Sequence, residues 1–153
     1  MAFSSRALQL TIQAILGIVI VGLAYVLYDS ITTPYEEVER RKEVTEQTRA
    51  NMNNVRQSLI LYERANGRYV SSLDSLVMWF HTDSLMAASI DSLFGAGFDI
   101  ESLPYSPRTG NMFELTVNDT LLTSTYLLTD PDSDDFIGTL ADDITRLNAA
   151  SWE

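Results

Sequence analysis

Residues 7–28 read ALQLTIQAILGIVIVGLAYVLY and decide the architecture, because they form one uncharged apolar stretch between Arg6 and Asp29. An α-helix rises about 1.5 Å per residue, so this stretch is long enough to cross the hydrocarbon core of a bilayer. Tyr25 and Tyr28 stand near its far end, where amphipathic rings favour the membrane interface. The stretch predicts a transmembrane helix with one domain outside the membrane.

Two features of this span leave alternatives open. Gln9 and Gln13 share one helix face, where they either contact another helix or lie at headgroup depth. The small-x-small pattern at residues 22–24 makes a cleaved signal peptide the alternative to an anchor. We expect an uncleaved anchor, because the apolar run continues through residues 25–27.

The charged residues on either side of the span give the expected topology. Residues 1–6 form a cytoplasmic tail, 7–28 the transmembrane helix, 29–66 a helical stem and 67–153 an acidic head outside the membrane. Basic residues favour the cytoplasmic side of a span, and Arg6 lies on the N-terminal side, although residues 40–42 read RRK on the other. By analogy with bacterial proteins of this layout, we expect a single-pass inner-membrane protein whose head is periplasmic or extracellular.

Composition limits the chemistry and the partners of the head. The chain has no cysteine, which excludes disulfides and thiolate chemistry, and its net charge is −11. From Tyr69 onward there are fourteen acidic residues, and the only basic ones are Arg108 and Arg146. Such a head repels nucleic acid, so its expected charged partners are cations or basic protein surfaces.

The stem has the composition of a helix. Residues 36–66 contain no Gly or Pro and are rich in Glu, Arg, Gln, Leu and Met. Thr33 and Pro34 fit two alternatives: a helix that starts there, with Thr33 as N-cap, or a kink in a helix that continues from the membrane. Gly67 is expected to end the helix.

Heptad spacing shows which face of the stem is buried. Two series recur every seven residues, namely Val38, Thr45, Met52 and Leu59, and Arg41, Thr48, Val55 and Tyr62. The apolar residues concentrate in the second half, at Met52, Val55, Leu59, Ile60 and Tyr62. We therefore expect the C-terminal half of the stem to pack on its own head, and the polar N-terminal half to be a spacer or a weak contact surface.

Short elements are expected in the head. Residues 71–77 predict a helix capped by Ser71 or Ser72, and residues 84–94 predict a second. Residues 111–117 and 121–129 predict an antiparallel hairpin with a two-residue turn, and residues 138–148 a short helix or an irregular wrap. The fold class is α+β: a long N-terminal helix packed on a small antiparallel sheet.

One block carries a family resemblance. Residues 55–69 read VRQSLILYERANGRY, and residues 72–76 follow with SLDSL. An amphipathic helix, a Tyr, Asn-Gly-x-Tyr and then Ser-Leu-x-x-Leu resembles type IV pilin-like and type II secretion pseudopilin-like proteins, and also small single-span proteins of the Bacteroidetes type. The resemblance implies a pilin-like fold and a role in a cell-envelope assembly.

The N-terminus departs from the prepilin pattern. Ala2-Phe3 is similar to the prepilin cleavage junction, but Ala7 stands where prepilins carry Glu, and no basic leader precedes the junction in this sequence. The cleavage motif is therefore not matched, and the resemblance supports the fold more than pilus formation.

The densest group of carboxylates lies at residues 130–135, which read DPDSDD. Alternating acids at Asp130, Asp132 and Asp134 are typical of a calcium loop. Asp135 replaces the glycine of such a loop, and Ala141 stands where its bidentate Glu belongs. The alternatives are a calcium site on those three residues and an acidic turn in which an Asp caps a following helix.

No sequence motif indicates catalysis. His81 is the only histidine and is expected to be a partly buried residue at a helix end; no nucleophile motif or phosphate-binding loop is present. We expect a non-catalytic, membrane-anchored, pilin-like structural or interaction protein without a small-molecule substrate, whose partners are other envelope proteins or further copies of itself. The alternatives are an accessory subunit of a divisome-like or secretion-like membrane complex and a calcium-dependent binding module.

Overall fold

The computed structural model describes residues 5–120 and 123–153. The chain divides into two units, residues 1–43 and residues 44–153. Helix α1, Ser5–Asn66, contributes to both units. Residues 31–34 lie inside α1, so of the two alternatives for Thr33 and Pro34 the helix start is wrong and the continuing helix is confirmed, while a kink there stays a prediction.

In the first unit, α1 exposes its apolar side chains on every face. Ile18, Val21 and Leu27 are 73%, 70% and 63% exposed, and the described part of the span has no buried residue. Within the described residues, α1 is the single helix that is long and apolar enough to cross a membrane. Residues 1–4 of the expected cytoplasmic tail lie outside the described residues.

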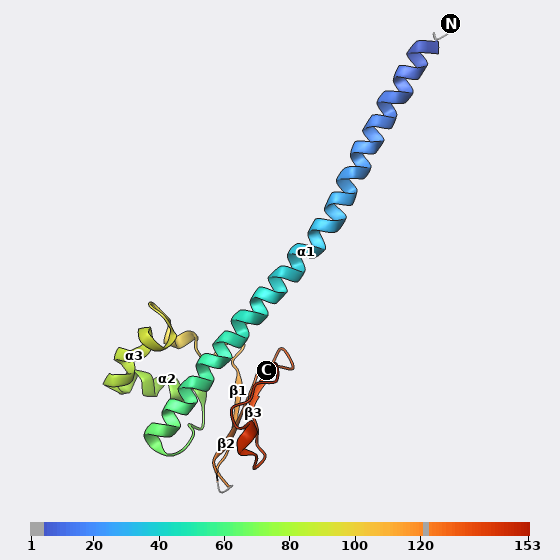
Figure 1. Ribbon diagram of the computed structural model, residues 1–153. Helices are drawn as coiled ribbons and strands as arrows, with labels where there is room; N and C mark the ends of the chain where they lie inside the picture. The colour runs from blue at the N-terminus through green and yellow to red at the C-terminus, as the bar shows by residue number, and fades with distance from the viewer. Residues whose placement is uncertain (1–4, 121–122) are drawn as a thin grey trace. The chain divides into compact units, whose positions relative to one another are not determined.

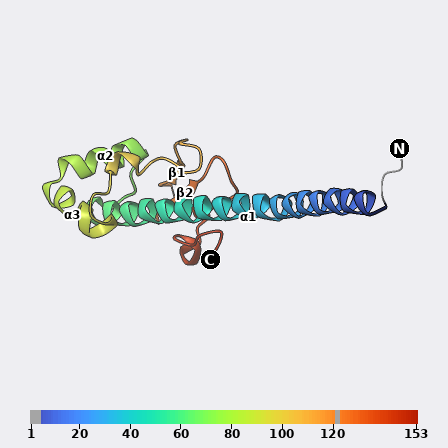
Figure 2. The ribbon, with the colours of Figure 1, turned by 90° about the horizontal axis from the view of Figure 1, so that it is seen from above.

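The second unit combines the C-terminal part of α1 with shorter helices and a small sheet, and Figures 1 and 2 show these elements along that part of α1. After the C-terminal part of α1 come α2 (Leu73–Thr82), α3 (Ser84–Phe94), η1 (Ile100–Ser102), β1 (Glu114–Asn118), β2 (Thr125–Thr129), β3 (Phe136–Gly138) and η2 (Ile144–Arg146). This confirms the expected class, α+β with a long N-terminal helix and a small antiparallel sheet.

Local capping chemistry sets the ends of the helices. Gly67 has φ 74° and donates its N–H to the Glu63 carbonyl at 2.6 Å, which confirms it as the residue that ends α1. Ser72 accepts the N–H of Ser75 at 3.2 Å and so caps α2. Asp83 accepts two backbone N–H groups at the start of α3, whose bounds match the predicted residues 84–94.

The sheet has the order β1-β2-β3 with both neighbours antiparallel. The predicted hairpin is present, but its two-residue turn is wrong, because Asn118 pairs with Thr125 and residues 119–124 connect the strands. Residues 121 and 122, expected at the start of the second strand, lie outside the described residues. Strand β3 was not expected. Its Gly138 has φ 91°, and a Cβ there would collide with the backbone oxygen of Tyr126.

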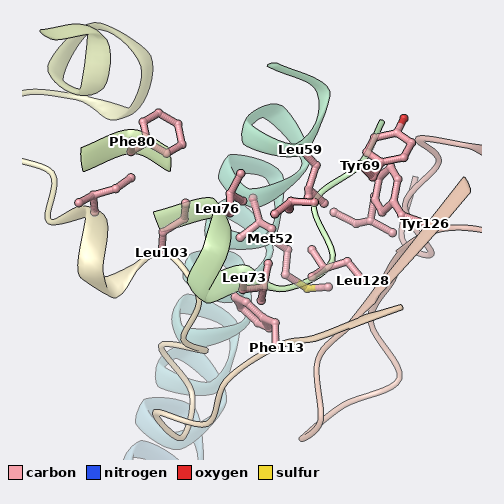
Figure 3. Close-up of a cluster of buried hydrophobic side chains, with 14 of the residues drawn as sticks. Met52, Leu59, Tyr69, Leu73, Leu76, Phe80, Leu103, Phe113, Tyr126 and Leu128 are labelled. Carbon is pink, nitrogen blue, oxygen red and sulfur yellow. The ribbon is translucent and has the colours of Figure 1, made fainter. Parts of the chain in front are cut away.

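The heptad face of α1 enters the core of this unit. Met52, Val55 and Leu59 are fully buried, which confirms that the C-terminal half of the stem packs on its own head. Figure 3 shows Met52 and Leu59 among side chains of the other elements, namely Leu73, Leu76 and Phe80 of α2, Leu103, Phe113, and Tyr126 and Leu128 of β2. Thus α1 is both the N-terminal apolar helix and a structural part of the head.

A row of aromatic contacts connects α1 with the helical hairpin α2–α3. The ring of Tyr62 lies 5.2 Å from that of Trp79, at an edge-on angle of 79°. Trp79 contacts Phe80, and Phe80 contacts Phe94 of α3. Edge-to-face pairs add about 0.5–1.5 kcal/mol each to area burial, so these rings hold the hairpin against α1.

Candidate functional site

The predicted acidic loop, residues 130–135, joins β2 to β3 as a closed turn. The Asp130 N–H donates to the Asp135 carbonyl at 3.0 Å, and the Ser133 N–H donates to the Asp130 carbonyl at 3.3 Å. Since β2 and β3 pair on either side of the turn, both ends of the loop are fixed in place. The loop therefore has both ends held by the sheet and carries four carboxylates.

Asp135 belongs to an ion pair with α1 that the sequence did not indicate. Its carboxylate accepts two hydrogen bonds from Arg49, at 2.9 Å from Nη2 and at 3.1 Å from Nε. The hydrogen bonds that Arg49 donates to Asp135 raise the pKa of the Arg49 guanidinium above its ordinary value. The same guanidinium lies 5.1 Å from the centre of the Trp152 ring, which is a cation–π arrangement. Arg49 thus connects α1, the acidic loop and the C-terminal segment.

Asp130 has the most buried side chain of the loop and faces Arg108. The Asp130 side chain is 0% exposed, accepts the Ser133 hydroxyl at 2.7 Å and lies 3.7 Å from Arg108 Nε. Arg108 Nη2 lies 3.9 Å from Asp135 and donates to the Thr45 hydroxyl at 3.4 Å. Arg108, one of the two basic residues after Tyr69, is therefore placed against two carboxylates of the head.

The other predicted metal ligands point to other partners. Asp132 accepts the Asn111 amide at 3.1 Å from each carboxylate oxygen, and also accepts the Thr109 hydroxyl. Asp134 is exposed to solvent. Within residues 5–120 and 123–153, no three His, Cys, Asp or Glu side chains are grouped so as to hold a metal ion. The calcium site on Asp130, Asp132 and Asp134 stays a prediction.

The carboxylates and arginines together form a cross-linking cluster. Guanidinium groups of Arg49 and Arg108 supply positive charge beside Asp130 and Asp135, which is the electrostatic role that a calcium ion plays in a calcium loop. The arginines come from α1 and from the segment before β1, so the cluster fixes the β2–β3 loop to both. Sequence reasoning missed it because the partners are far apart in the chain.

A second group of polar side chains surrounds a groove of about 190 Å³ between α2 and η1. His81 lies in the last turn of α2 as expected, but it is exposed rather than partly buried, and its Nε2 lies 2.7 Å from Glu101 Oε1. Pairing with the exposed Glu101 holds the imidazole at the surface. Together with Asp74, these two residues make the rim of this groove polar.

No family model matches the chain, and no curated protein or solved structure is similar to it. The resemblance to type IV pilin-like and pseudopilin-like proteins stays a prediction.

Proposed function

We propose that this chain is a non-catalytic, membrane-anchored structural or interaction protein of a bacterial cell envelope, with a pilin-like layout. The N-terminal part of α1 sits in the inner membrane, the N-terminus faces the cytoplasm, and the acidic head acts in the periplasm or outside the cell. One observation carries the proposal: α1 is apolar and exposed through residues 7–28, whereas Met52, Val55 and Leu59 of the same helix are fully buried in the head.

The exposure of the span supports a lipid environment. A helix that is apolar on all faces is normally buried in a protein core or in a membrane. Here Leu10, Ile18 and Val21 are 67%, 73% and 70% exposed, and a soluble monomer rarely leaves so continuous an apolar surface in water. A bilayer removes this surface from water and leaves the backbone groups satisfied within the helix.

The burial of α1 side chains in the core of the head supports a head that stays attached to the membrane span. Leu59 and Val55 lie in the same hydrophobic core as Tyr126 and Leu128 of β2. The head therefore loses part of its core if α1 is removed, and an anchor of this kind delivers a folded head to one membrane surface. Its strongly acidic composition supports contact with basic protein surfaces and opposes contact with nucleic acid.

Carbonate washing of isolated membranes tests the anchor. The wild-type protein is expected in the pellet, and mass spectrometry is expected to find its first residues intact. The variant carrying Ile18→Lys and Val21→Lys is expected to shift to the soluble fraction, because charges near a bilayer centre cost about 2.5–3.5 kcal/mol each. Val38→Lys, at an exposed position outside the span, is the matched control and stays in the pellet. A soluble wild-type protein beginning at Tyr25 refutes the proposal in favour of a signal peptide.

A second candidate function, an accessory subunit of a divisome-like or secretion-like complex, is favoured by Gln9 and Gln13. Both are exposed on one face of the span, and amides in lipid find hydrogen-bond partners on neighbouring helices. Purification in mild detergent followed by mass spectrometry distinguishes the two functions. Fixed stoichiometric partners that are lost in Gln9→Leu with Gln13→Leu support the accessory subunit, whereas a preparation of this chain alone supports the structural protein.

A further inference from the structure

The three-stranded sheet has two edge strands, β1 and β3, and the chain itself closes the edge at β3. Ala150 forms an antiparallel bridge with Ile137 on the outer side of β3. Beside it, the Gly138 N–H donates to the Ala149 carbonyl at 2.9 Å. The segment that contains Ala149 and Ala150 therefore takes the place of a fourth strand, and the outer edge of β3 is not available to a partner.

The register of the sheet shows which backbone groups of β1 face outward. In an antiparallel sheet, the N–H and C=O of one residue point to the same neighbour, and successive residues alternate between the two neighbours. The Asp130 N–H donates toward β3, to the carbonyl just before that strand, so Thr129 turns toward β1 and its partner there is Glu114. Leu115 and Val117 alternate with Glu114 and therefore direct their N–H and C=O groups to the outer edge.

A hydrogen bond just before β1 agrees with this assignment. Phe113 lies two residues before Leu115, so it faces the same side, and its N–H donates to the Pro104 carbonyl at 2.8 Å. Beyond Phe113, within residues 5–120 and 123–153, no backbone hydrogen bond reaches Leu115 or Val117 from this side. Two donors and two acceptors thus point in a row to a strand position that the described part of the chain does not fill.

The side chains of Leu115 and Val117 are also incompletely covered. Both pack against the core from the same sheet face as Leu128 and Tyr126, their partners in β2. The two β2 side chains are fully buried, whereas Leu115 and Val117 are only half-buried. A further strand beside β1 covers them, because directly opposite side chains of neighbouring strands lie about 5 Å apart.

The charge around β1 indicates which kind of strand fits there. Residues 109–145 contain eight acidic residues and no Lys or Arg, and Glu114 and Asp119 are exposed at the two ends of β1. Edge strands are commonly protected from pairing by Lys or Pro, but β1 reads ELTVN and has neither. A basic segment is attracted to this edge, whereas a second acidic head is repelled from it.

We propose that the outer edge of β1, named here the open edge and formed by residues 114–118, binds an extended segment of a basic partner protein by strand addition. The backbone of the segment pairs with Leu115 and Val117, its alternate apolar side chains cover these two residues, and its Lys or Arg side chains lie near Glu114. The inference rests on the proposed function and names the chemistry of the partner: an envelope protein with an exposed segment of alternating basic and apolar residues.

Peptide titration of the detergent-solubilised full chain, followed by NMR of the backbone amides, tests this contact. The probe is a seven-residue peptide in which Val alternates with Lys. Saturable shifts are expected at the amides of Leu115 and Val117, and none at Ala150 on the closed edge. The same peptide with Glu in place of Lys is expected to bind about tenfold more weakly, because like charges then meet at Glu114.

N-methylation of the peptide distinguishes strand addition from attraction between charges alone. In the bound strand the Val residues lie opposite Leu115 and Val117, so their amides face β1 and the Lys amides face away. Methyl groups on the Val amides are expected to lower the affinity about tenfold, because the hydrogen bonds to β1 are lost. Methyl groups on the Lys amides are the matched control and are expected to leave the affinity unchanged.

A variant of the protein tests the same hydrogen bonds from the other side. Val117→Pro removes one outward N–H and leaves the bonds between β1 and β2 in place, as prolines in edge strands do. It is expected to weaken binding of the Lys peptide, and its melting temperature verifies that the head is folded. The methylated peptides give an independent answer with the unaltered protein.

Four results overturn the proposal. They are no shift at Leu115 or Val117, equal affinity of the two methylated peptides, equal affinity of the Lys and Glu peptides, and a wild-type dimer that protects the same amides without peptide, which assigns the open edge to a second copy. Failure of the anchor is distinguishable from these results. A protein that stays in the carbonate-washed pellet but does not bind the peptide refutes strand addition alone, whereas a wild-type protein found in the soluble fraction refutes the proposed function itself.

Discussion

The variant Arg108→Met removes the cation next to the most buried carboxylate of the protein. The Asp130 side chain is 0% exposed and lies 3.7 Å from Arg108 Nε. Met retains most of the apolar stem of arginine, so the change removes charge and hydrogen-bonding capacity with little loss of packing. It tests whether Arg108 compensates the buried charge of Asp130.

The expected loss of stability is about 2–3 kcal/mol. Removing one partner of a buried ion pair costs about 3–5 kcal/mol, because the other charge stays buried without compensation. Two features of the site reduce this figure. Arg108 is 28% exposed, and Asp130 keeps the hydrogen bond from the Ser133 hydroxyl at 2.7 Å. Asp135 is less affected, since Arg49 still donates two hydrogen bonds to it.

Denaturant unfolding of the detergent-solubilised full chain, followed by tryptophan fluorescence, measures the change. Arg146→Met is the matched control, because Arg146 is 77% exposed and its ion pair with Asp143 is long, at 3.9 Å. Its free energy of unfolding is expected to change by less than about 0.5 kcal/mol. Asp130→Asn completes a double-mutant cycle. The double variant is expected to be at least about 1 kcal/mol more stable than the sum of the single effects predicts, because no charge is left unpaired.

Two outcomes refute this reasoning. If Arg108→Met costs no more than Arg146→Met, Arg108 does not compensate Asp130. If the effects of Arg108→Met and Asp130→Asn on the free energy of unfolding simply add, the two side chains are not coupled. Their interaction then makes no contribution to stability.

Three further predictions follow from the core and the loop. Leu59→Ala is expected to cost about 2–4 kcal/mol in denaturant unfolding, because Leu59 is 0% exposed; a cost under about 0.5 kcal/mol means that this face of α1 is not part of the core. Burial raises the pKa of Tyr126 above its usual value near 10, so its contribution to stability is complete below pH 10 and is lost as the pH rises above it. Tyr126→Phe is expected to flatten the fall of unfolding free energy above pH 10 and to cost about 1 kcal/mol at neutral pH through the lost hydrogen bond to Asn148; an unchanged alkaline slope contradicts the assignment. Millimolar calcium is expected to raise the melting temperature if the loop binds it, and Asp132→Asn with Asp134→Asn is expected to abolish that rise; a melting curve indifferent to calcium and to chelator leaves an acidic turn.

The sequence alone was enough for the elements that depend on local chemistry. The buried face of α1 follows from the 3.6-residue period of an α-helix, so Met52, Val55 and Leu59 were identified correctly. The end of α1 at Gly67, the cap of α2 at Ser72 and the bounds of α3 depend on residues only a few positions away, whereas α2 continues to Thr82, beyond the predicted end at residue 77. Such effects are complete within one or two turns of chain, which is why they are visible in a single sequence.

The hairpin register required the tertiary structure. Asn118-Asp119 has the residue types of a tight turn, but Asn118 pairs with Thr125, so six residues instead of two separate the strands. In the observed register, the buried side chains of Tyr126 and Leu128 both point into the core from β2. Burial of these side chains, and not turn propensity, therefore decided where the strands meet.

The arginine–carboxylate cluster also required the tertiary structure. Arg49 and Asp135 are 86 positions apart, and neither has neighbours in sequence that mark it as half of an ion pair. Alternating acids at Asp130, Asp132 and Asp134 left a calcium loop and an acidic turn as alternatives, because the sequence shows charges but not what faces them. Which cation meets a buried carboxylate depends on how α1, the segment before β1 and the β2–β3 loop pack together, and this packing is set by the shared core that surrounds Leu59 and Leu128.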